Sequence, residues 1–220
     1  MINFEHIITN MPGITVIIID SGRNKEWLKV AQASVLNQIY PLKKDVDGTG
    51  RLQIELMVAV NKEKHYKIGQ CWNKMIQSAK HNYIFIFDDD DKLAQMILFN
   101  LMFYYQVLKL DKKNKDIIGV SPYLTLMEEV DGKMEYTPST YYTSGLIEKK
   151  WLLKIPFNEE LDRGVDIQWD EDIIKKKKFV AIQKSNYGYY YRQHDSMVSG
   201  RNQDYRLAGR RLNKMVDIEI

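Results

Sequence analysis

Two runs of apolar, mostly β-branched residues constrain the fold more than any other feature of the sequence. They cover residues 14–19 and 56–60, show no alternation with polar residues and are followed by polar residues. Such runs are typical of strands that are buried on both faces of a parallel sheet. Parallel neighbours need long crossover connections, so helices are expected between the strands and over the sheet.

The segments between and after these runs alternate between helical and extended patterns. The first helical pattern ends at Tyr40-Pro41, where proline disfavours helix in the preceding residue. The expected order after the first strand covers residues 25–38 (helix), 56–60 (strand), 68–80 (helix), Tyr83–Phe87 (strand), 92–110 (helix) and 117–120 (strand). This alternation predicts a parallel, right-handed, Rossmann-like sheet for the first half.

The second half is less regular. Asp131-Gly132 predicts a β-hairpin turn between strands at 123–130 and 133–136. The remaining expected elements are a short helix at 149–154, an acidic stretch at 159–172, an apolar strand at 179–182, a tyrosine-rich run at 187–191 and a terminal helix at 201–220. The tyrosines are interpreted as alternating strand residues rather than as a surface that stacks on sugars.

Composition excludes several classes of protein. The chain has 220 residues with 45% hydrophobic and 28% charged positions, which is the balance of a globular protein and suits one domain. The single Cys71 cannot form a disulfide within the chain, and the N-terminus lacks the pattern of a secretory signal, so a cytoplasmic setting is expected. The most apolar stretch, residues 96–105, is too short to span a membrane.

Four consecutive aspartates, Asp88 to Asp91, directly follow a predicted buried strand. Open α/β sheets bind their ligands at this end of the strands. Asp88 and Asp90 are expected to project to one side, where a Mg²⁺ or Mn²⁺ ion would relieve their repulsion and hold the diphosphate of a nucleotide donor. Asp91 is interpreted instead as a cap of the helix at 92–110. Asp20 and Asn61, which follow the ends of two other strands, are candidate contacts of the nucleotide base.

Five segments, in this order, resemble the family-2 type glycosyltransferases with the GT-A fold, and together they extend over residues 13–201. They are ITVIII at 14–19, SVLNQIYP at 34–41, IGQCWNKMIQSAKHNYIFIFDDDD at 68–91, TSGLIEKKWL at 143–152 and YYYRQHDSMVSGR at 189–201. Each segment alone is a weak signal, whereas five in the family's order are far more specific.

The resemblance implies a GT-A type sandwich, with a mostly parallel central sheet, helices on both faces and a smaller mixed β region on the acceptor side. It implies one domain over 1–220, in which 13–121 bind the nucleotide sugar, 122–200 serve acceptor and catalysis, and 201–220 form a C-terminal helix. The implied activity is that of an inverting hexosyl- or pentosyltransferase, which moves a sugar from a nucleoside-diphosphate sugar to a hydroxyl of a glycan, lipid-linked or modified nucleobase acceptor, with Mn²⁺ or Mg²⁺. The site residues implied are Asp88, Asp90 and His194 for the metal and Asn73, Asp88, Asp89 and Arg192 for the donor.

The catalytic base is expected within GVDIQWDED, residues 164–172. The resemblance makes Asp172 the first choice, because Glu171-Asp172 matches the family's acidic pair by residue type. The spacing to the next strand favours Asp166 instead. Both candidates stay open at the level of sequence, and a solvated helix start rich in acidic residues is the structural alternative.

Several residues depart from the family's pattern, which leaves the nucleotide undetermined. Val60-Asn61 replaces the acidic end of the second strand, Asp20-Ser21-Gly22 replaces a Pro-Thr-Tyr type loop, and Trp72 replaces an arginine.

Two other functions are weighed against sugar transfer. Nucleotidyl transfer also uses strand-end carboxylates, but no glycine-rich phosphate loop lies near the N-terminus. A non-catalytic module could bind nucleic acid or another acidic polymer through Lys175 to Lys178 and the arginines near the C-terminus, and the same basic face could serve a nucleic-acid acceptor. We favour the interpretation that this lysine run is the solvent-exposed end of a helix, where positive charge is favourable.

Overall fold

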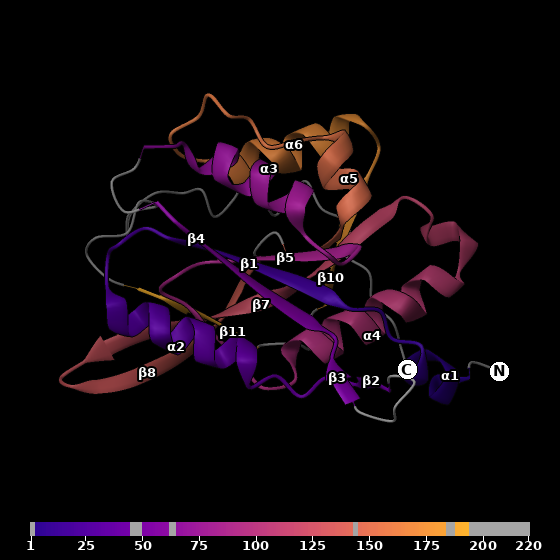
Figure 1. The fold of residues 1–220 in the computed structure, drawn as a ribbon, viewed down its shortest axis with the longest axis horizontal. Helices are drawn as coiled ribbons and strands as arrows, with labels where there is room; N and C mark the ends of the chain where they lie inside the picture. The colour runs from indigo at the N-terminus through magenta and orange to yellow at the C-terminus, as the bar shows by residue number, and fades with distance from the viewer. Residues whose placement is uncertain (1–2, 45–49, 62–64, 143–144, 184–187, 194–220) are drawn as a thin grey trace.

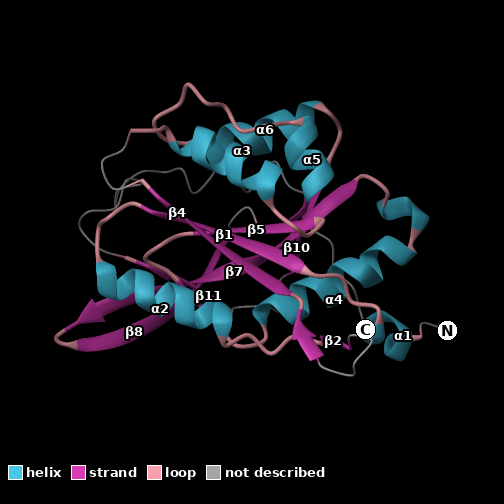
Figure 2. Cartoon of the chain, in the orientation of Figure 1, coloured by secondary structure: helices cyan, strands magenta, loops and turns pink. Residues whose placement is uncertain are grey.

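A computed structural model of the chain describes residues 3–44, 50–61, 65–142, 145–183 and 188–193. Within these residues, nine strands form one large sheet and helices cover both of its faces (Figures 1 and 2). The helical elements are α1 Phe4–Thr9, α2 Lys25–Leu36, α3 Ile68–Ser78, α4 Ile97–Leu110, a 3-10 turn at Lys112–Asn114, α5 Lys149–Lys154 and α6 Val165–Lys175. The strands are β1 Ile14–Asp20, β2 Leu42–Lys44, β3 Gly50–Leu52, β4 Ile54–Val60, β5 Tyr83–Phe87, β6 Lys92–Leu93, β7 Ile117–Val130, β8 Lys133–Tyr142, β9 Leu146–Glu148, β10 Phe179–Gln183 and β11 Tyr189–Arg192.

The first half of the sheet confirms the expected parallel arrangement. β1 lies between β4 and β5 and pairs with both in parallel register. Every residue of β1 is buried, as the unbroken apolar run predicts. The prediction was wrong for β4, which forms the edge of the sheet and exposes Val58 and Val60 by 37% and 68%. An edge strand has a neighbour on one side only, so its residues are less covered than those of β1.

Two hydrophobic layers hold the helices to the sheet. On one face α2 and α4 pack against Val16, Ile18, Phe85 and Phe87. On the other face α3, α5 and α6 pack against residues such as Ile17 and Ile86, and Figure 2 shows these three helices together above the sheet. The alternation of side chains along β1 and β5 thus supplies both layers.

The acidic loop does not run directly into a helix. Residues 92–93 form β6, which pairs antiparallel with β11, and α4 begins only at Ile97 with Met96 as its N-cap. The prediction of a helix from residue 92, capped by Asp91, was therefore wrong. The antiparallel pairing of Lys92 and Leu93 with Tyr190 and Tyr189, residues far apart in sequence, keeps this segment extended.

The second half contains the expected hairpin and an unexpected strand. β7 and β8 pair around Asp131-Gly132, and both turn residues have positive φ (50° and 73°), as a tight hairpin turn requires. The short β9 lies between β5 and β7 and runs antiparallel to both. The sheet is therefore mixed, and the long β7 carries it from the parallel half into the β8 and β11 region (Figure 1).

None of the helices that the structure describes is both long and apolar enough to cross a membrane. The helix expected at 201–220 lies outside the described residues.

Candidate active site

The carboxyl ends of β1, β4 and β5 meet at one edge of the sheet, as the parallel register requires. Asp20 closes β1 and is buried, and the backbone N–H of Asn61, just past β4, donates to its carbonyl oxygen at 2.9 Å. The Asn61 side chain donates through Nδ2 to the carbonyl oxygen of Tyr66 at 2.8 Å and accepts from the Tyr66 N–H at 3.3 Å. The structure thus brings Asp20 and Asn61 together beside the acidic loop.

The four aspartates after β5 have different surroundings. The side chain of Asp88 is exposed, whereas Asp89, Asp90 and Asp91 are 3%, 6% and 1% exposed. Burial of this many acidic groups is unfavourable unless cations or hydrogen-bond donors surround them. The contacts of each carboxylate therefore show what the loop is built to hold.

Asp89 ties the acidic loop to the loop after β1. Its Oδ2 accepts hydrogen bonds from the backbone N–H of Ser21 at 2.8 Å and from Ser21 Oγ at 2.6 Å. Its Oδ1 accepts from Arg23 Nη2 at 2.7 Å. Asp89 is thus already bound by the protein on both oxygens.

Arg23 is a cation placed within the acidic loop. Besides its bond to Asp89, its Nη1 lies 2.9 Å from Asp90 Oδ2, and its Nε donates to Ser21 Oγ at 2.7 Å. Desolvation lowers the pKa of the guanidinium, but the charges of Asp90 and Asp89 outweigh it and the pKa is raised. One guanidinium therefore offsets part of the negative charge and fixes the orientation of Asp90.

Three of the carboxylates converge on a single point. One oxygen each from Asp88, Asp90 and Asp91 lies within 4.8 Å of the others. Asp91 Oδ1 accepts from the backbone N–H of Arg192 at 2.8 Å, but its buried Oδ2 has no hydrogen-bond partner among the described residues. Oxygen atoms at this spacing, one of them buried and without a partner, suit a hard divalent cation.

Electrostatics at the triad point the same way. Displacement of water by surrounding protein, and then the charge of Asp90, raise the pKa of Asp88 to about 7, although one side of Asp88 meets solvent. Burial, and then the charges of Asp88 and Asp90, raise the pKa of Asp91 well above its usual range. The protein alone therefore holds these groups at a cost, and a bound cation would relieve it.

The two candidate bases occupy different parts of α6. Asp166 lies in the first turn, where burial raises its pKa, and its charge contributes to the raised pKa of Asp88. Its side chain is nevertheless exposed on one side. Asp172 lies almost two turns further on and accepts from Lys175 Nζ at 2.9 Å and from Gln168 Nε2 at 3.2 Å. Only Asp166 is therefore electrostatically coupled to the acidic loop by a described interaction.

Arg192 joins β11 to the acidic loop. Its Nε donates to the backbone oxygen of Asp90 at 2.8 Å, and its guanidinium lies 5.0 Å from the centre of the Trp27 ring. Arg192 thus lies beside the triad, as its place in the sequence suggests. The predicted metal ligand His194 lies outside the described residues.

Asn73 is bound to a loop of the protein. Its Nδ2 donates to the carbonyl oxygen of Phe157 and to Glu159 Oε1, both at 2.9 Å, and its Oδ1 accepts from the Phe157 N–H at 2.9 Å. These bonds hold the segment before α6 against α3. The described contacts of Asn73 are therefore structural.

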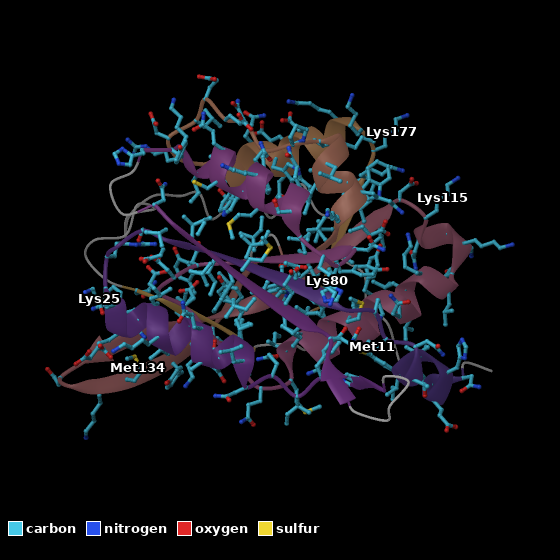
Figure 3. The ribbon with its side chains drawn as sticks, in the orientation of Figure 1. Met11, Lys25, Lys80, Lys115, Met134 and Lys177 are labelled. Atoms are coloured by element: carbon cyan, nitrogen blue, oxygen red, sulfur yellow. The ribbon has the colours of Figure 1, made fainter. Side chains whose placement is uncertain are left out.

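The lysine run forms the end of a helix. α6 ends at Lys175, Lys177 has a positive φ of 54°, and the N–H of Lys178 returns to the carbonyl of Ile173 at 2.9 Å. This is the geometry of a helix C-terminus, where lysines are favoured. Figure 3 shows Lys177 on the outer surface beyond the helix.

Sequence reasoning missed Ser21, Arg23 and Trp27. All three follow the first strand, in a segment where the resemblance predicts a different loop. Asp20-Ser21-Gly22-Arg23 contained one usable signal, an arginine three residues after a strand end that faces an acidic loop. Its contacts with Asp89 and Asp90 depend on the pairing of β1 with β5.

The fold is that of the GT-A glycosyltransferases, an α/β architecture with a large, curled mixed sheet flanked by helices. Among solved structures, the chain is similar to TarS of S. aureus in complex with UDP-GlcNAc, with a TM-score of 0.55, 16% identity, and coverage of 84% of this chain and 60% of that one. It is also similar to GalNAc-T7 with UDP, GalNAc and Mn²⁺, with a TM-score of 0.58, 12% identity, and coverage of 84% and 44%.

Another TarS structure matches with a TM-score of 0.54 and 14% identity over 83% of this chain, which spans only 37% of that TarS chain. The chain thus spans between 37% and 61% of the length of the solved proteins that it resembles. No protein-family model and no curated protein sequence matches it.

Proposed function

We propose that the protein is a metal-dependent glycosyltransferase that moves a sugar from a nucleoside-diphosphate sugar to an acceptor hydroxyl with inversion. The observation that carries this proposal is the convergence of Asp88, Asp90 and Asp91 at the carboxyl edge of a GT-A sheet, with a buried Asp91 oxygen that has no hydrogen-bond partner among the residues that the structure describes. The presence of UDP, UDP-GlcNAc and Mn²⁺ in similar structures supports the choice of ligands.

The acidic triad is the proposed cation site. Asp88, Asp90 and Asp91 would hold Mn²⁺ or Mg²⁺, which supplies positive charge for a diphosphate leaving group. Asp20 and Asn61 are proposed to contact the base of the nucleotide, because they lie at the ends of β1 and β4 beside the triad. Arg192, whose guanidinium lies over the Trp27 ring, is the nearby cation proposed for the phosphates.

Asp166 is the proposed catalytic base. It lies at the start of α6, its carboxyl has a raised pKa, and its charge acts on Asp88. In this role its carboxylate accepts the proton of the acceptor hydroxyl while that oxygen attacks the anomeric carbon on the face opposite the leaving diphosphate. Asp172 is the weaker choice, since Lys175 and Gln168 engage its carboxylate.

A donor panel tests the proposal. The protein is incubated with UDP-, GDP- and dTDP-sugars and Mn²⁺, and release of nucleoside diphosphate is measured. We expect turnover with at least one donor, release of nucleoside diphosphate rather than sugar 1-phosphate, and loss of turnover in Asp90→Ala. Release of sugar 1-phosphate would instead indicate nucleotidyl transfer, and no binding of any nucleotide in the presence of Mn²⁺ would reject both enzyme classes.

The base is tested with a matched pair of variants on one helix. Asp166→Asn is expected to lower kcat about 1000-fold, within the range found for general bases, while donor binding is retained. Asp172→Asn serves as its control, with kcat expected within twofold of the wild type. The reverse result would return the assignment to Asp172.

A further inference from the structure

Two tyrosines form an exposed aromatic corner beside the acidic loop. The ring of Tyr136 on β8 meets the ring of Tyr190 on β11 at 70°, with the ring centres 5.4 Å apart. Tyr136 is 48% exposed and Tyr190 is half-buried. The ammonium group of Lys92 lies 5.9 Å from the centre of the Tyr190 ring. We call Tyr136, Tyr190 and Lys92 the aromatic corner.

The corner lies on the sheet face that also carries Arg192 to the triad. Tyr189 points into the core, where its ring meets Phe87 at 5.5 Å, so Tyr190 and Arg192 leave β11 on the other face. The Arg192 side chain then donates to the Asp90 backbone. Lys92 directly follows Asp91 and pairs with Tyr190 across β6 and β11. The corner and the proposed metal site are therefore neighbours.

The charge around the corner limits what can bind there. The hairpin that carries Tyr136 also carries Glu129, which pairs with Met134 on the same face of the two strands, whereas Glu128 and Glu135 pair with each other on the opposite face. With Lys92 and Arg192 on the same face as Tyr190, the charge here is mixed and does not form the continuous basic surface that binds the phosphates of a nucleic acid. Two rings are also far smaller than the roughly 800 Å² that each partner contributes to a stable protein interface.

A neutral carbohydrate fits these limits. The C–H face of a sugar ring can lie on an exposed tyrosine ring, while the phenol hydroxyls and the Lys92 ammonium group offer hydrogen bonds to sugar hydroxyls. We propose that the aromatic corner binds a sugar ring of a neutral glycan acceptor, and that this sugar stacks on the ring of Tyr136. This inference rests on the proposed function, since it assigns the acceptor of the same site. It also revises the sequence interpretation for Tyr190, though not for the buried Tyr189.

The test measures glycan binding separately from nucleotide binding. Chitotetraose, cellotetraose and maltotetraose are titrated against the protein in the presence of UDP and Mn²⁺ by calorimetry. At least one is expected to bind, and Tyr136→Leu, which removes the ring but keeps an apolar side chain on the strand, is expected to weaken it about tenfold. Tyr136→Phe keeps the ring and is expected to bind within twofold of the wild type.

Phe4→Ala is the matched control, because Phe4 is a 42% exposed ring on α1, on the opposite side of the molecule from β8 (Figure 1). No binding of any of the three glycans, or equal binding by Tyr136→Leu and the wild type, overturns the inference. Binding of an oligothymidine that depends on Tyr136 also overturns it. UDP binding with Mn²⁺ is measured in the wild type and in every variant. If UDP binds but no glycan does, the inference about the corner fails and the proposed function stands. If the wild type does not bind UDP, the proposed function itself fails.

Discussion

The guanidinium of Arg23 lies 2.9 Å from the carboxylate of Asp90, in the centre of the acidic loop. A positive side chain thus already occupies one oxygen of an aspartate that we propose as a metal ligand. Because the same guanidinium also binds Asp89, Asp90 is fixed in orientation from outside the triad. Hydrogen bonds of this kind orient metal ligands and commonly change metal affinity when they are lost.

Replacement of Arg23 by lysine should weaken metal binding. Arg23→Lys keeps the charge but cannot bind Asp89 and Asp90 as a fork, so Asp90 loses its fixed orientation. We expect the Mn²⁺ affinity to fall about tenfold, the lower limit for loss of such supporting contacts. Calorimetric titration of Mn²⁺ in the presence of UDP measures it. Lys29→Ala is the control, because it removes a cation of α2 that pairs only with the exposed Glu26 among the described contacts. Unchanged affinity in Arg23→Lys would contradict a positioning role.

Replacement of Asp91 by asparagine should raise the stability of the metal-free protein and weaken metal binding. Asp91→Asn removes a buried carboxylate that is close to two others, and its new amide can donate toward them. Without metal at pH 8, we expect the variant to be more stable than the wild type by about 1 kcal/mol. Its Mn²⁺ affinity should fall, because an amide oxygen is a weaker ligand than a carboxylate. Urea unfolding and Mn²⁺ titration give the two quantities, and a variant that is both less stable and equally able to bind Mn²⁺ would refute the assignment.

Asp89 is expected to matter for stability even without ligands. Asp89→Ala removes one of the two carboxylates that bind Arg23 and the acceptor of both the Ser21 N–H and the Ser21 hydroxyl. We therefore expect the free energy of unfolding to fall by about 3 kcal/mol. Asp162→Ala is the control, since its 84% exposed side chain lies 3.6 Å from Lys67 and surface pairs contribute less than about 1 kcal/mol. Equal urea midpoints for the two variants would show that the loop does not depend on Asp89.

Glu55, which lies at the start of β4, should make the free energy of unfolding depend on pH. Partial burial would raise its pKa, but hydrogen bonds from Thr15 Oγ1 at 2.6 Å and the Lys80 N–H at 2.8 Å outweigh this and lower the pKa below 4.5. Because the folded state favours the charged form, its contribution is present above pH 4.5 and is lost as the pH falls through the folded pKa. Glu55→Gln should therefore be less stable than the wild type at pH 7, and the difference in urea midpoint should shrink below pH 4.5. A constant difference from pH 7 to pH 3 would argue against this origin.

The sequence by itself determined the elements whose signals are local. An unbroken apolar run specified β1, aromatic and β-branched residues specified β5, and Asp131-Gly132 specified the β7 and β8 turn, because burial in a sheet and positive φ each require particular residues at particular positions. The strand-end rule also placed Asp20, Asn61 and Asp88 at one edge, because parallel strands end together.

The tertiary structure alone decided which acidic groups act together. Asp91 was interpreted as a helix cap. Because β6 pairs with β11, α4 begins only at Ile97, and the Asp91 carboxylate lies beside those of Asp88 and Asp90. Arg23 meets Asp90 because β1 and β5 are neighbours, although 66 residues separate Arg23 from Asp89. Asp166 and Asp172 look equally acidic in the sequence, and only the packing of α6 brings the charge of Asp166 to bear on Asp88. Charges and hydrogen bonds act through space over a few ångströms, and distance along the chain does not record that proximity.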